Sequence, residues 1–199
     1  MTKYKLEPHF CSPEGKNQVI LNCSTGTGVI LPSHNEEHSQ LFNPYVIATV
    51  PLDTSFLSNP TVKVDFSSII TYKESGSYPS DLRITFQLSK VCNGVKIGMG
   101  TWNFERFFDK EYSYGGSGRA VAGQETAQLN GGGYYSSITA QTVDTFDFVW
   151  CGCQDCPGCC HFMVEVINVE SKNVDFAAVT NCMINAIAVG PMMHGDNDD

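Results

Sequence analysis

The feature of the sequence that most constrains the fold is a strict alternation of apolar and polar residues. Residues 82–89 read Leu-Arg-Ile-Thr-Phe-Gln-Leu-Ser, with an apolar side chain at every second position. Successive side chains of a β-strand point to opposite faces, so this segment is predicted to be a strand with one buried and one solvated face. The same alternation recurs in residues 62–66, 146–150 and 162–166.

Turn signals and shorter apolar runs extend this pattern along the chain. Asn93-Gly94 separates residues 88–91 from residues 95–99 and predicts a β-hairpin of these two segments. Further apolar runs cover residues 19–21, 29–31, 45–50 and 174–189. The sequence shows no convincing period of an amphipathic helix. We therefore predict an all-β fold, a single jelly roll or β-sandwich of about eight strands.

The two ends of the chain differ from its middle. At 199 residues the chain has the size of one domain. Residues 1–17 are largely polar and contain two prolines, which predicts an extended N-terminal arm. Residues 191–199 are predicted to be an acidic tail, and residues 18–190 the folded domain. A segment rich in Gly, Ser and Tyr, residues 112–135, is predicted to be a long loop.

The charge balance excludes several kinds of partner. Lys and Arg total 12 against 21 Asp and Glu, a formal net charge of −9, whereas nucleic-acid binding needs a cationic surface. No apolar stretch reaches the roughly 18 residues of a membrane-spanning helix. The N-terminus lacks the apolar run of a signal peptide, and because the numbering begins at Met1 we expect that no leader has been removed. We predict neither nucleic-acid binding nor membrane insertion.

Nine cysteines are an unusual number for one domain of this size. Five of them lie in residues 151–160, the cysteine cluster, which reads Cys-Gly-Cys-Gln-Asp-Cys-Pro-Gly-Cys-Cys. Two cysteines separated by two residues can bind one Zn²⁺, but a standard zinc site combines two such pairs from separate hairpins. The four cysteines outside the cluster are isolated from one another: Cys11, Cys23, Cys92 and Cys182.

Disulfide bonds are therefore favoured over metal for these sulfurs, with Zn²⁺ as the alternative and no cofactor otherwise predicted. The candidates within the cluster, for disulfides or alternatively for metal, are Cys151, Cys153, Cys156, Cys159 and Cys160, and Cys92 joins them from outside. If Cys159 and Cys160 begin a strand, they point to opposite faces and have different partners.

The odd number of cysteines adds a constraint. Disulfides between different residues use cysteines two at a time, so one thiol must stay reduced, pair with its own symmetry mate or bind metal. Cys11 lies on the predicted arm, where a partner within the same chain is hardest to hold. The alternative for Cys11 is an exposed free thiol.

Motifs of catalysis are missing from the sequence. It has no Gly-x-Ser-x-Gly nucleophile elbow, and its Gly-rich segment at residues 114–119 lacks the Gly-Lys-Ser/Thr ending of a phosphate-binding loop. We predict that the protein is not an enzyme and has no catalytic residues. Tyrosines that flank Gly-rich turns could stack on sugars, which leaves a carbohydrate-binding jelly roll as an alternative: Tyr112, Tyr114, Tyr134 and Tyr135.

The cysteine cluster and the strand after it resemble a clostridial-type family of small cysteine-rich proteins of unassigned function. Residues 179–189, Val-Thr-Asn-Cys-Met-Ile-Asn-Ala-Ile-Ala-Val, also look like the closing strand of that family. The resemblance covers roughly residues 80–190. It implies no function.

The layout of the chain is also similar to the subunits of bacterial endospore appendage fibres. The shared features are a cysteine on the N-terminal arm, a jelly-roll body, and a cysteine in the first and in the last strand. In those fibres the arm of one subunit forms disulfides with strand cysteines of earlier subunits. The resemblance implies that Cys11 is the donor and that Cys23 and Cys182 are acceptors. Those subunits are shorter, however, and lack the cysteine cluster.

The resemblance to fibre subunits implies a structural role. We expect a self-assembling subunit of a pilus-like fibre or spore-surface appendage, a helical homopolymer with disulfide cross-links through the arm. The location implied is extracellular or on the spore surface, without a signal peptide, and additional spore-surface or tip proteins are possible partners. A zinc-binding intracellular β-domain built on the cysteine cluster is the main alternative.

Overall fold

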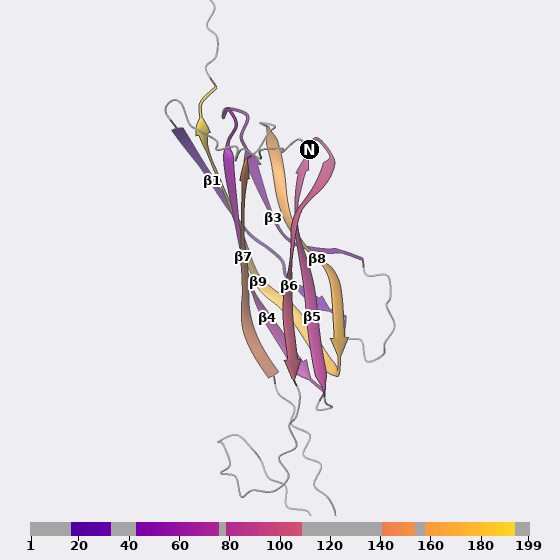
Figure 1. Ribbon diagram of the computed structural model, residues 1–199. Helices are drawn as coiled ribbons and strands as arrows, with labels where there is room; N and C mark the ends of the chain where they lie inside the picture. The colour runs from indigo at the N-terminus through magenta and orange to yellow at the C-terminus, as the bar shows by residue number, and fades with distance from the viewer. Residues whose placement is uncertain (1–16, 33–42, 76–78, 109–140, 154–157, 194–199) are drawn as a thin grey trace, which may run out of the picture.

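The computed structural model of the protein describes residues 17–32, 43–75, 79–108, 141–153 and 158–193. These residues form nine β-strands and no helix (Figure 1). In chain order they are β1 (Asn17–Thr25), β2 (Val29–Leu31), β3 (Tyr45–Asp53), β4 (Thr61–Glu74), β5 (Ser80–Cys92), β6 (Val95–Phe108), β7 (Gln141–Cys153), β8 (Cys159–Lys172) and β9 (Val174–Pro191). The predicted arm before residue 17, all of the predicted 112–135 loop and the end of the tail lie outside the described residues.

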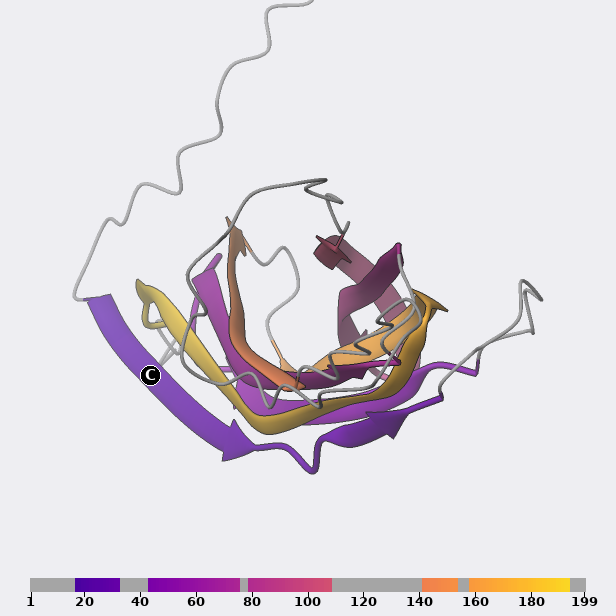
Figure 2. The same cartoon turned by 90° about the horizontal axis from the view of Figure 1, so that it is seen from below.

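The strands form two antiparallel sheets that curve around a shared interior (Figure 2). The first sheet has the order β1-β9-β4-β7, and the second has the order β3-β8-β5-β6. Because β2 also pairs with β9, beyond the end of β1, the two short strands together occupy one position at the edge of the first sheet. Two four-position sheets in this order have the topology of a jelly roll, so the predicted all-β sandwich is confirmed.

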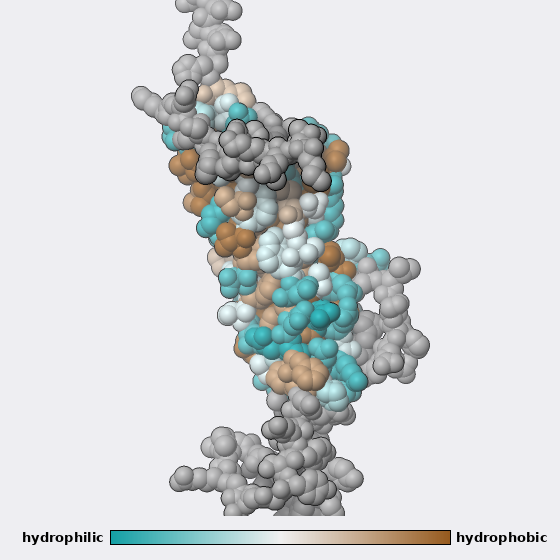
Figure 3. All heavy atoms as spheres, viewed as in Figure 1, coloured by the Kyte–Doolittle hydropathy of each residue, from teal (hydrophilic) through white to brown (hydrophobic). Residues whose placement is uncertain are grey.

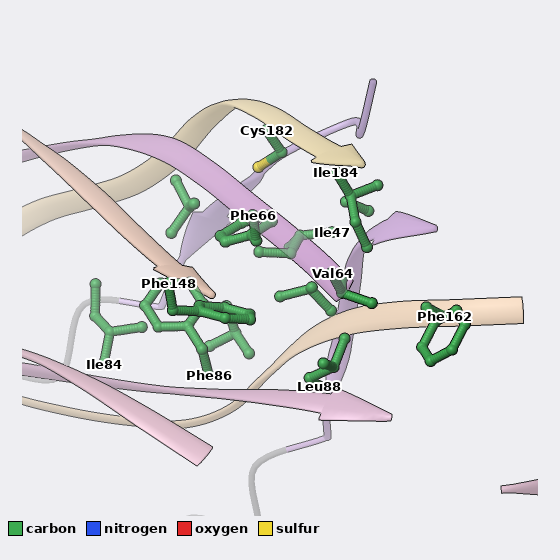
Figure 4. Close-up of a cluster of buried hydrophobic side chains, with 14 of the residues drawn as sticks. Ile47, Val64, Phe66, Ile84, Phe86, Leu88, Phe148, Phe162, Cys182 and Ile184 are labelled. Carbon is green, nitrogen blue, oxygen red and sulfur yellow. The ribbon is translucent and has the colours of Figure 1, made fainter. Parts of the chain in front are cut away.

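The alternating segments bury the faces that the sequence predicts. In β5 the side chains of Leu82, Ile84, Phe86 and Leu88 are all buried, and those between them are more exposed. The inward residues of both sheets meet in one hydrophobic core, where aromatic rings lie between the layers (Figure 4). The predicted register of residues 82–88 is thereby confirmed.

Aromatic stacking joins the two sheets along the side formed by β6 and β7. Phe86 of β5 stacks on Phe146 of β7 with ring centroids 4.4 Å apart, and Trp102 of β6 stacks on Phe148 of β7 at 3.9 Å. Toward one end of the same side, Arg106 Nε donates to Asp144 Oδ2 at 2.9 Å. Side chains rather than backbone hydrogen bonds therefore link β6 to β7.

The predicted hairpin at Asn93-Gly94 joins β5 to β6. Both residues have positive φ angles, 51° and 77°, which is the conformation that a two-residue turn of type I′ requires. The sequence pattern underestimated the strand after the turn, however. It predicts a strand over residues 95–99, whereas β6 continues to Phe108. The added part lacks a regular alternation, and it packs through the stacking of Trp102 and the burial of Phe104.

The buried register of β5 generates a first prediction. Phe86→Ala removes a ring that contacts both Phe146 and Phe66, and it should lower the free energy of unfolding by about 3–5 kcal/mol. Gln87→Ala, on the opposite face of the same strand, should change it by no more than about 0.5 kcal/mol. Urea unfolding followed by tryptophan fluorescence measures both, and equal losses would contradict this register.

Candidate functional site

The strands bring five cysteines to one end of the sandwich. Cys153 is the last residue of β7 and lies opposite Thr61, the first residue of β4. Cys159 and Cys160 begin β8, and Cys92 ends β5. The cysteine cluster is therefore divided between two strands that belong to different sheets. Cys151 lies in β7, two residues before its end.

A disulfide between Cys92 and Cys160 ties two neighbouring strands together. The two residues are directly opposite each other in β5 and β8, with their Cα atoms 4.6 Å apart, and they are 68 residues apart in the sequence. Cys160 is buried, so the bond covers the end of the core. Cys153 is disulfide-bonded as well.

The neighbouring residue Cys159 points the other way. It is exposed and has a free thiol, whereas Cys160 faces the interior. The prediction that these two adjacent cysteines point to opposite faces is confirmed, although only Cys160 has a disulfide partner among the described residues. Three exposed free thiols now stand on the outer surface of the described sandwich: Cys23 of β1, Cys151 of β7 and Cys159 of β8.

Cys182 is the one free cysteine of the described residues that is buried. Its side chain is 1% exposed, and burial raises the pKa of its thiol to about 11. The β1–β2 connection packs against it, because Gly26 N–H donates to the carbonyl oxygen of Cys182 at 2.8 Å. A Cβ atom at Gly26 would overlap the carbonyl oxygen of Ile47, so the close approach requires glycine. A partner chain has no access to this sulfur in the folded protein.

Cys23 lies in a different setting, on an edge strand with exposed apolar neighbours. Val19 and Leu21 are 66% and 64% exposed on the same face of β1. Beside them on β9 lie Val189 and Ile187. Figure 3 shows hydrophobic residues gathered along the upper left of the molecule, where Figure 1 places β1 and the end of β9. These four side chains and Cys23 form the β1 patch.

Not every outward residue of the predicted strands is solvated. Glu165 alternates with Val164 and Val166 and was expected on the wet face of its strand, yet it is buried. Lys96 Nζ lies 2.6 Å from its carboxylate and Ser89 Oγ donates to it at 3.2 Å. The buried carboxylate is thus paired with a lysine of β6, a contact that the local sequence pattern does not predict. The sequence offered no signal for it.

Several predicted residues lie outside the described part of the chain, among them Cys11 and Cys156, and all four tyrosines of the sugar-stacking hypothesis. Within the described residues, no group of three His, Cys, Asp or Glu side chains is arranged to hold a metal ion. A zinc site on four cysteines of the cluster needs free thiolates, whereas Cys153 and Cys160 are disulfide-bonded. That alternative therefore requires a reduced protein.

The fold and these sulfurs define a class: a jelly-roll sandwich with a cross-strand disulfide inside and free thiols on its surface. The chain belongs to the family described as Domain of unknown function (DUF4489), whose model matches residues 17–189. The match begins at β1 and ends within β9, so it spans both sheets. It agrees with the predicted membership of a family without an assigned function. No curated protein matches the chain.

The described residues contain no helix that is long and apolar enough to cross a membrane.

The cross-strand disulfide yields a second prediction. Replacing Cys92 and Cys160 together by alanine opens a loop of 68 residues, and the entropy of the unfolded chain should then lower the free energy of unfolding by about 4 kcal/mol. Cys159→Ser, which changes an exposed free thiol next to the bond, should cost no more than about 0.5 kcal/mol. Urea unfolding of the three proteins measures this, and a double variant as stable as the wild type would contradict it.

A third prediction separates the free thiols by reactivity. The thiolate is the form that alkylates, and at pH 8 a thiol whose pKa is about 11 is almost entirely protonated. Iodoacetamide should therefore modify Cys23, Cys151 and Cys159 of the folded monomer and leave Cys182 unmodified until urea is added. Peptide mass spectrometry identifies the modified sites. Modification of Cys182 at the rate of Cys23 would show that its environment opens in solution.

Proposed function

We propose that the protein is a structural subunit that self-assembles into an extracellular fibre or a spore-surface appendage, with disulfides between subunits. The observation that carries this proposal is the division of the sulfurs. The sandwich already contains its stabilising disulfide, and it still presents three free thiols on its surface. A free thiol on the surface adds no cross-link to the monomer, whereas it is accessible for a disulfide with another copy.

The architecture supports the same role. An all-β sandwich with open sheet edges can be extended by strands from a neighbour, and contacts between two different surfaces produce filaments where they do not close into a ring. The similarity to endospore appendage subunits adds a location on the spore surface or outside the cell. The partner is then a second copy of the chain, and further spore-surface or tip proteins belong to the same hypothesis.

The arm supplies the covalent link in this proposal. Cys11 precedes β1 by six residues, and the resemblance offers Cys23 and Cys182 as its acceptors. Burial disfavours Cys182, because its sulfur cannot be reached without opening the β1–β2 connection. The exposed thiols of Cys23, Cys151 and Cys159 are the acceptors that a folded neighbour can offer.

A fourth prediction tests the arm. Oxidised wild-type protein should form multimers that resist boiling in detergent and dissociate on reduction, because Cys11 links each copy to the next. Cys11→Ser should remove the arm-dependent bands and shorten or abolish filaments in negative-stain microscopy. Deletion of residues 1–15, which ends before β1, should leave a folded monomer with an unchanged melting temperature.

Cys182→Ser is the control for that experiment, since a buried thiol takes no part in cross-linking and the multimers should be unchanged. Multimers that are identical in wild type and Cys11→Ser would move the covalent link away from the arm. A wild-type protein that remains monomeric under oxidising conditions at high concentration would rule out the fibre.

A further inference from the structure

Strand β1 and the second half of β7, at the two edges of the first sheet, lack the features that normally prevent edge strands from pairing. Such features are charged side chains, proline and bulges. The nine residues of β1 include no charge and no proline, and two of them are exposed aliphatic residues. The second half of β7, residues 148–153, reads Phe-Val-Trp-Cys-Gly-Cys and is uncharged as well.

The edges of the second sheet are protected by comparison. Strand β3 contains Pro51 and a register shift between Val46 and Ala48. Strand β6 carries Lys96, Glu105 and Arg106. In the first sheet, by contrast, all of β1 and the second half of β7 are free of charge and proline.

The two unprotected segments also lie at the same height in that sheet. Four residues form one row across the sheet, each directly opposite the next. In order from β1 through β9 and β4 to β7 they are Leu21, Ile187, Lys63 and Cys151. Cys23 is two residues beyond Leu21 and is exposed on the same outer face as Cys151. Each uncharged edge therefore carries one exposed free thiol, at positions that differ by one step of the alternation.

We propose that β1 of one copy pairs with the second half of β7 of the next copy, and that Cys23 and Cys151 form a disulfide across this contact. The proposal rests on the proposed self-assembly and specifies its lateral interface. The partner that binds the β1 patch is a second copy of the chain. The second half of β7, at the opposite edge of the same sheet, is uncharged like β1, has apolar side chains like β1 and carries one exposed thiol like β1. Two copies with a net charge of −9 each repel, so contact is favoured where neither carries charge.

Strand direction agrees with this contact. Neighbouring strands of the first sheet are antiparallel, so β1 and β7, separated by two strands, run in opposite directions. A second copy displaced sideways, without being turned over, brings its β7 antiparallel to β1. The contact joins two different surfaces, so it repeats from copy to copy. In the proposed fibre the twist of the continuous sheet turns each copy relative to the last without closing a ring, and the array is helical.

The geometry of paired strands suits the bond. Directly opposite residues of antiparallel strands have Cα atoms about 4.5–5.5 Å apart, within the range of about 4.4–6.8 Å found for disulfides. The chain already makes such a bond between opposite residues, at Cys92 and Cys160. Hydrogen-bonded positions alternate along an antiparallel pair, and Gly26 N–H donates to Cys182 O of β9, so the N–H of Cys23 faces the open edge. That N–H donates to the side-chain oxygen of Asn22 at 3.0 Å, a local bond that a neighbouring strand would replace.

The bond must form between copies. Within one copy β9 and β4 separate β1 from β7, so Cys23 and Cys151 are about 14 Å apart at the usual strand spacing. The oxidant is a small disulfide such as oxidised glutathione. One thiolate displaces a glutathione thiolate, the other attacks the mixed disulfide, and the products are the protein disulfide and two molecules of reduced glutathione. Pairing of Cys23 with Cys151 leaves Cys159 as the exposed acceptor for the arm.

The test is peptide mapping of assembled full-length protein. An equal mixture of unlabelled and ¹⁵N-labelled protein is oxidised with oxidised glutathione, digested without reductant and analysed by mass spectrometry. We expect peptides that join residue 23 to residue 151, half of them with one light and one heavy partner. Cys23→Ser and Cys151→Ser should each abolish these peptides, whereas Cys159→Ser, which changes an equally exposed thiol, should retain them.

A second pair of variants tests the strand contact without altering sulfur. Leu21→Lys adds a charge to the β1 edge and should reduce the yield of the 23–151 peptides at least tenfold. Val95→Lys, at a similarly exposed position on β6, should leave the yield unchanged. Circular dichroism should show both variants folded, because both side chains face solvent.

The outcomes separate this interface from the proposed function. Filaments with links that depend on Cys11 but without 23–151 peptides would overturn the lateral contact and leave the fibre proposal standing. A joined peptide found only in all-light or all-heavy form would show a bond within one copy and would also overturn it. Absence of any multimer would overturn both proposals.

Discussion

The packing of aromatic side chains between the two sheets is the interaction on which the rest of the structure depends. Phe86 and Trp102 of one sheet stack on Phe146 and Phe148 of the other, and Phe66 lies among them. Rings of this size fill the space between two layers and remove large apolar areas from water. Because a strand presents alternate residues to opposite faces, burying these rings also decides which neighbouring residues face outward.

That alternation sorts the sulfurs into internal and external groups. Cys160 and Cys182 share the inward face of their strands with core residues, whereas Cys23, Cys151 and Cys159 share the outward face with exposed ones. A slip of one residue in any of these strands would exchange its inside for its outside, so the core register and the chemistry of the cysteines are linked. The inner sulfurs serve stability or remain inert, and the outer sulfurs are available to a partner.

The two sheets differ at their edges, and the proposed assembly uses this difference. The edge strands of the second sheet contain proline, a bulge and several charges, while β1 and the second half of β7 at the edges of the first sheet are uncharged. In a chain with a net charge of −9, such segments are where copies meet with the least repulsion. In the proposed fibre a covalent arm and a lateral sheet contact act in different directions, which would make the fibre both continuous and difficult to dissociate.

Local pattern alone determined the fold class, the register of residues 82–88, the turn at Asn93-Gly94 and the opposite orientation of Cys159 and Cys160. These properties depend on residues adjacent in the sequence, whose side chains alternate in any strand. Tertiary structure decided that Cys92 pairs with Cys160 across 68 residues, that Cys182 is buried, and that Lys96 covers Glu165. It also decided that Cys23 and Cys151 occupy opposite edges of one sheet. Each of these depends on the order of strands in a sheet, and that order is set by which faces pack together rather than by any local sequence pattern.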